Sequence, residues 1–85
     1  MELRTQDVTW RRSGEEVVIL DLRSSEYLAL NASGALLWER LAQGSAEPDA
    51  LNAVLVERYG IDPRTAENDV QAFVELLRTH DLVVA

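Results

Sequence analysis

The sequence predicts an α+β fold in which a three-stranded antiparallel sheet is followed by three helices. In the first thirty residues, short aliphatic and β-branched runs are separated by turn residues, which is the pattern of strands. From Asn31 onward, the apolar residues recur at helical spacing instead, and capping residues divide the remainder into three segments. Strands grouped before helices are typical of α+β domains.

Three strands account for the N-terminal region. The clearest runs from Glu16 to Leu22, a segment rich in aliphatic and β-branched residues that follows turn residues at 12–15. A segment with weaker patterning, Leu3 to Trp10, is its expected partner. After a second turn at 23–25, the segment from Glu26 to Leu30 alternates its side chains between two faces. We therefore expect a three-stranded meander that ends with Glu26–Leu30.

Three helices follow, and each carries start or stop signals of its own. Asn31 is a good N-cap for the first helix, and a proline stands in the first turn of the second and of the third. Gly60 suits the C-terminal end of the second helix. The expected helices cover Asn31–Gly44, Glu47–Gly60 and Pro63–His80. Residues 82–84 then form either a short final strand or a packed tail, and residues 1–85 make a single domain.

The second and third helices, joined by the tight turn at 60–62, resemble a helix-turn-helix, a motif that suggests DNA. The charge of the chain argues against this use. Its 85 residues include eight arginines, no lysine and fifteen acids, for a net charge of -7. Residues 44–85 hold three arginines and eight acids, so the half that would read DNA is the more acidic half. Such a helix would meet phosphate with net repulsion, and we expect no nucleic-acid partner.

The sequence contains few residues that could catalyse a reaction. The chain has no cysteine, which suits a reducing compartment and excludes thiol nucleophiles and cysteine–zinc sites. Its one histidine, His80, is expected near a helix end, and the sequence contains no nucleophile elbow, phosphate-binding glycine loop or calcium-loop spacing. No segment approaches the ~18 apolar residues of a membrane helix. We therefore expect a cytoplasmic, non-enzymatic protein with no metal, cofactor or membrane partner.

The last strand of the meander is an edge of the sheet unless another segment covers it. Its sequence is Glu26, Tyr27, Leu28, Ala29 and Leu30. Glu26 is its only charge, whereas sheet edges are usually guarded by charge or proline. An extended peptide could pair with this edge as an additional strand. Whether Leu28 or Ala29 directs its N–H outward stays open.

The third helix has an apolar face wider than one core stripe requires. At about 100° per residue, its apolar side chains span an arc of roughly 160°, against the ~100° of a core-facing stripe. One flank of this arc holds Asp69, Phe73, Leu76 and His80. This flank either packs beneath the strands or the tail, or stays free and forms a peptide groove with the edge strand. In such a groove, Asp69 would favour a peptide that carries Lys or Arg.

The run from Val18 to Asn31, followed by Ala32–Trp38 and Leu41, resembles the core signature of PqqD-like proteins. These proteins are the leader-peptide recognition elements of ribosomally synthesised and post-translationally modified peptides (RiPPs). The stretch from Ala66 to Val83 is similar to the last helix and tail of the same family. The resemblance spans about residues 16–84.

Within that family, the Asp-Leu-Arg-Ser segment at 21–24 and the Leu-Asn helix start at 30–31 look most like free-standing recognition proteins of lasso-peptide clusters. The resemblance implies a winged helix-turn-helix in which the leader of a precursor peptide pairs with the third strand and lies against the third helix. It also implies a separate leader peptidase and a cyclase as partners. Asp81 stands where the family often has glycine. The alternative is an acidic winged-helix transcriptional regulator or interaction module.

Overall fold

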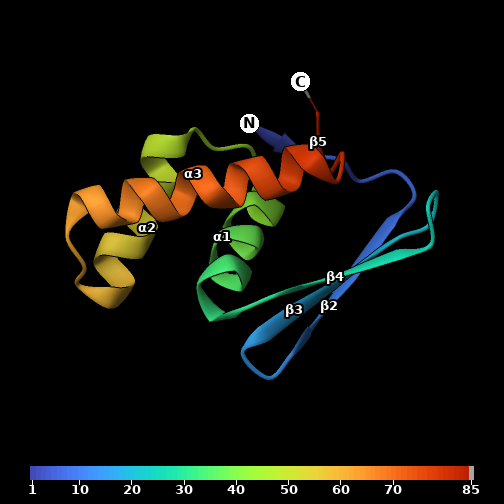
Figure 1. Cartoon of the computed structure of the whole chain (residues 1–85), viewed down its shortest axis with the longest axis horizontal. Helices are drawn as coiled ribbons and strands as arrows, with labels where there is room; N and C mark the ends of the chain where they lie inside the picture. The colour runs from blue at the N-terminus through green and yellow to red at the C-terminus, as the bar shows by residue number, and fades with distance from the viewer. Residues whose placement is uncertain (85) are drawn as a thin grey trace.

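The computed structural model describes residues 1–84 and has the predicted α+β architecture (Figure 1). Its elements in chain order are β1 (Glu2–Leu3), β2 (Val8–Ser13), β3 (Glu16–Asp21), β4 (Glu26–Leu30), α1 (Ala32–Gln43), α2 (Pro48–Tyr59), α3 (Pro63–Thr79) and β5 (Val83–Val84). Strands β2, β3 and β4 form an antiparallel sheet in that order, and β1 pairs with β5. This is a winged helix-turn-helix, with the sheet as the wing.

The first strand of the sheet differs from the sequence prediction of Leu3–Trp10. The strand β2 begins at Val8 and continues through Ser13, while Glu2–Leu3 pairs separately with β5. The turn after β2 is only Gly14–Glu15, with Gly14 at a φ of 65°. A positive φ at the first turn position is what a two-residue hairpin needs, and it lets the strand extend into the residues predicted as turn.

The helix predictions are confirmed to within one or two residues. The side chain of Asn31 caps α1 by accepting a hydrogen bond from the Gly34 N–H at 3.0 Å, and Asp62 caps α3. Gly60 ends α2 in the left-handed conformation, at a φ of 62°. Asp81 has a φ of 54°, so this position adopts a conformation that favours glycine. The segment that follows is a strand, β5, and not merely a packed tail.

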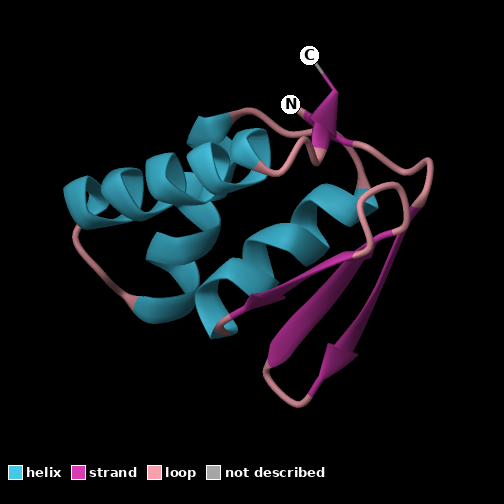
Figure 2. Ribbon diagram, turned by 45° about the vertical axis from the view of Figure 1, so that its right-hand side comes forward, coloured by secondary structure: helices cyan, strands magenta, loops and turns pink. Residues whose placement is uncertain are grey.

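The hydrophobic core lies between the inner face of the sheet and the helices, which all lie on one side of the sheet (Figure 2). Val17, Ile19 and Leu30 form the part of the core that comes from the sheet. Trp38 of α1 is buried and packs edge-to-face against Trp10, with ring centroids 6.1 Å apart. The largest fully buried side chains of α2 and α3 are Leu51, Leu55, Val70 and Leu77, and Phe73 of α3 is 6% exposed.

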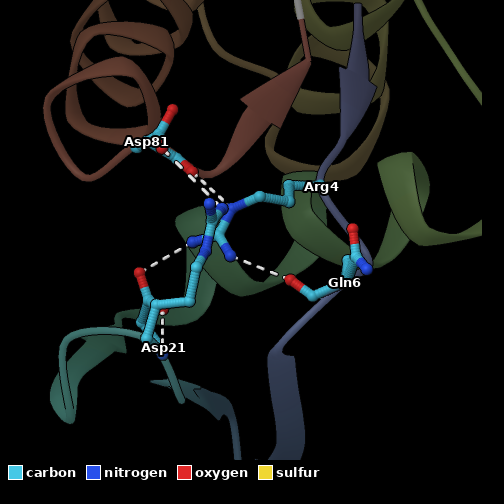
Figure 3. A network of polar contacts seen from close by, with 5 residues as sticks. Arg4, Gln6, Asp21 and Asp81 are labelled. Carbon is cyan, nitrogen blue, oxygen red and sulfur yellow. Dashed lines mark hydrogen bonds and ion pairs between the residues drawn. The ribbon is translucent and has the colours of Figure 1, made fainter.

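A polar network holds the β3–β4 turn against the end of α3 (Figure 3). The guanidinium of Arg4 donates to the Asp81 carbonyl at 2.7 Å, to the Gln6 carbonyl at 2.8 Å and to a carboxylate oxygen of Asp21 at 2.7 Å. The other carboxylate oxygen of Asp21 accepts from the Arg23 N–H at 2.9 Å. The network therefore fixes the spacing between the start of β4 and the end of α3.

Opposing effects act on the pKa of Asp21. Burial raises the pKa of this carboxyl, but hydrogen bonds from the Arg23 N–H and from Arg4, together with the positive charge of Arg4, outweigh burial. The net result is a pKa below the ordinary value of an aspartate. The carboxylate form is thus the one that the fold stabilises.

Candidate functional site

The direction of each backbone group in the sheet follows from the hairpin that joins β2 to β3. The residue pair that flanks a two-residue turn is hydrogen-bonded, and here this pair is Ser13 and Glu16. Beyond the other end of the same ladder, the Leu22 N–H donates to the Asp7 carbonyl at 2.8 Å. Even-numbered residues of β3 therefore direct their backbone N–H and C=O groups toward β2, and odd-numbered residues direct theirs toward β4.

This alternation identifies the free backbone groups of β4. The odd-numbered residues of β3 lie opposite Glu26, Leu28 and Leu30, so these three residues bond to β3. Tyr27 and Ala29 direct their N–H and C=O groups away from the sheet, and within residues 1–84 no further strand pairs with β4. The open choice between Leu28 and Ala29 is thereby resolved, and Ala29 is the outward-facing residue.

A groove of about 560 Å³ lies beside this free edge, between β4 and α3. The apolar residues at its base are buried: Leu30, Leu37, Leu55 and Phe73. The more exposed members of its lining are Ala29 on β4, Asn31 and Ser33 at the start of α1, and Asp69, Ala72 and Leu76 on α3. The groove thus has a polar backbone edge on one side, an apolar base, and one carboxylate on the opposite side.

The structure places all nine predicted site residues along β4 and the facing side of α3. Five of them line the groove: Ala29, Leu30, Asp69, Phe73 and Leu76. The other four surround a small hollow of about 10 Å³ at the far end of the same strand: Glu26, Tyr27, Leu28 and His80. Tyr27 is 73% exposed, because it lies opposite Leu20, on the other face of the sheet from the buried Val17 and Ile19.

The apolar flank of α3 is neither fully packed in the core nor fully free. Phe73 is only 6% exposed and belongs to the core, yet it also lines the groove. Leu76 is half-buried, while Asp69 is exposed at the groove. The wide apolar arc therefore supplies both the core and the base of the groove.

Gly34 and Leu55 line the groove and are missing from the sequence prediction. A Cβ atom at Gly34 would lie 3.3 Å from the Cβ of Leu30, so a side chain there would crowd the groove. A glycine inside a helix costs about 1 kcal/mol relative to alanine, and its presence in the first turn of α1 is a signal for close approach. Leu55 carries no such signal, because its position depends on how α2 packs.

The charged side chains at the groove are acidic and have no ion-pair partner among residues 1–84. Among residues 1–84, neither Asp69 nor Glu26 lies within ion-pair distance of a cationic group. Residues 1–84 also contain no cluster of three or more side chains suited to a metal ion. The helices that the structure describes are too short and too polar to cross a membrane.

Comparisons with known proteins agree with this geometry. The family model of coenzyme PQQ synthesis protein D (PqqD) matches residues 16–83. The solved structure of TbiB1 in complex with the TbiA(beta) leader peptide matches with a TM-score of 0.87 and 28% sequence identity. The match covers 98% of this chain and 94% of the TbiB1 chain. A lasso peptide synthetase B1 complexed with the leader peptide has a TM-score of 0.83 and 30% identity, with coverage of 99% and 96%. The search of curated proteins found no significant match.

Proposed function

We propose a leader-binding function from one premise: the chain belongs to the PqqD family. It binds the leader of a RiPP precursor of the lasso type and presents that leader to a separate leader peptidase and a cyclase in the cytoplasm, without catalysing a reaction itself. Two similar chains, at 28% and 30% identity, were solved with leader peptides. The observation that carries the proposal is the open edge of β4 beside an apolar groove.

The leader adds to the sheet as a strand on β4, against α3. Its backbone pairs with the outward N–H and C=O groups of Tyr27 and Ala29, which gives affinity without regard to sequence. Alternate side chains of an added strand point to opposite faces, so every second leader residue reaches the groove. Phe73 and Leu76 provide the apolar surface for those residues, and apolar burial favours binding by about 25 cal/mol per Å².

Charge adds a preference for leader composition. Asp69 stands exposed at the groove, and Glu26 stands at the start of β4. A Lys or Arg of the leader near either carboxylate gains a modest interaction, because exposed ion pairs contribute only about 0.2–1 kcal/mol. The apolar residues of the leader therefore supply most of the side-chain affinity, and the basic residues adjust it.

The leader of the precursor peptide encoded beside this chain tests the proposal. Fluorescence anisotropy of the labelled leader should show saturable binding with one site per chain. No binding in the micromolar range would contradict the proposal. Retention of DNA in a gel shift, with affinity falling as salt rises, would instead favour the acidic winged-helix regulator.

A further inference from the structure

The strand β2 is a second free edge, on the opposite side of the sheet from β4. By the same hairpin register, Val8, Trp10 and Arg12 direct their backbone N–H and C=O groups away from β3. A second groove, of about 460 Å³, borders this edge. Its apolar lining includes Val8 and Trp10 of β2 and Trp38 and Leu41 of α1. Within residues 1–84 the sheet therefore offers two edges for strand addition, each beside a groove that is partly apolar.

The two edges differ in charge. The strand β2 carries two adjacent arginines, Arg11 and Arg12, and no acid, whereas the only charge on β4 is Glu26 at its first position. Arg12 lies opposite the buried Val17 and so shares the groove face, while Arg11 lies on the outer face of the sheet. A strand added to β2 would meet one guanidinium on each of its faces. Covering Arg11 removes water from a charge that has no ion-pair partner among residues 1–84, which is unfavourable.

An ion pair also joins β2 to α1 near the second groove. Arg12 of β2 pairs with Glu39 of α1. Neither residue lines the groove, whose lining comes from residues 2–5, β2, α1 and residues 44–45. An ion pair thus joins β2 to the neighbouring helix, and no such pair joins β4 to α3 within residues 1–84.

We propose that Arg11 and Arg12 are specificity determinants that keep the leader off β2, so that one chain binds one leader. The inference rests on the proposed function and deepens it. Asp69 and Glu26 favour a basic leader at β4, and the same leader is repelled by two arginines at β2. Charged side chains on an edge strand also prevent the strand from pairing with a second copy of the chain.

The variant R11T/R12L removes both guanidiniums and the ion pair while keeping residues that suit a strand. Native mass spectrometry with excess leader should count one leader on the wild-type chain and two on the variant. A variant that binds one leader per chain, whether as a monomer or as a dimer, overturns the inference.

The variant R58L/R64T is the matched control, because it removes the same charge from α2 and α3. It should bind one leader, like the wild type. Changes in the amide chemical shifts of Val8 and Trp10 locate the second leader on β2. If the leucine in R11T/R12L prevents folding, the variant R11T/R12T replaces it. A wild-type chain that binds two leaders contradicts this inference alone, whereas a wild-type chain that binds none contradicts the proposed function.

Discussion

Proline at position 29 is the sharpest perturbation of strand addition. The Ala29 N–H points away from β3, so a proline there removes a donor that the fold does not use. Proline is tolerated on edge strands when its nitrogen faces outward. Proline at Leu28 would be uninformative, because that N–H bonds to β3 and its loss would damage the sheet itself. We expect Ala29→Pro to fold and to bind the leader weakly.

The expected loss of affinity follows from the leader carbonyl that would accept a hydrogen bond from the Ala29 N–H. Once the leader lies in the groove, this carbonyl has left water, and without the N–H it has no partner. An unpaired buried acceptor costs about 1–3 kcal/mol. This free energy corresponds to a rise of roughly 5- to 150-fold in Kd.

Fluorescence anisotropy of the labelled leader measures this change, with circular dichroism to confirm the fold. Ala29→Ser keeps the N–H and should keep the affinity. Wild-type affinity in Ala29→Pro would refute pairing with β4.

Three further substitutions test the groove and the network. Asp69→Lys should lower the affinity for a basic leader by up to about fivefold at low salt, and anisotropy should show the difference shrinking at high salt; an equal loss at both salts would rule out a charge effect. Leu76→Ala should weaken leader binding about fivefold, since the exposed part of this half-buried side chain forfeits about 1 kcal/mol of apolar burial against the leader; unchanged affinity would remove it from the site. The lowered pKa of Asp21 means that its stabilisation is present above the pKa of an unfolded aspartate, about 3.9, and is lost as pH falls through the lower folded value. The Tm of the wild type should therefore approach that of Asp21→Asn in acid, and a Tm difference that is constant from neutral to acid pH would contradict this account.

Local signals in the sequence account for most of the fold. The caps at Asn31 and Asp62 and the glycine at 60 act on their own neighbours, so the helix bounds follow from the sequence. The strand β2 does not follow, because its exposed residues Thr9–Ser13 lack a strand pattern and are held by pairing with β3. Its identity thus depends on pairing with the next strand of the hairpin and on a turn shorter than predicted.

The site divides in the same way. Edge position and helix face can be inferred from periodicity, which is why Asp69 and Phe73 are predicted and line the groove. The outward direction of the Ala29 N–H depends on the register set by the Gly14–Glu15 turn, and no pattern within β4 reveals it. Leu55 enters the groove only through the packing of α2 against α3, so no local pattern predicts it.

Amide hydrogen exchange on the ¹⁵N-labelled chain tests strand addition to β4 most directly. In the free chain, the amides of Tyr27 and Ala29 should exchange fast, because they face away from the sheet, while Leu28 is protected by its bond to β3. Saturation with the leader should slow exchange at Tyr27 and Ala29 and leave Val8 and Trp10 unchanged. Saturable leader binding that leaves Tyr27 and Ala29 unprotected would contradict the account.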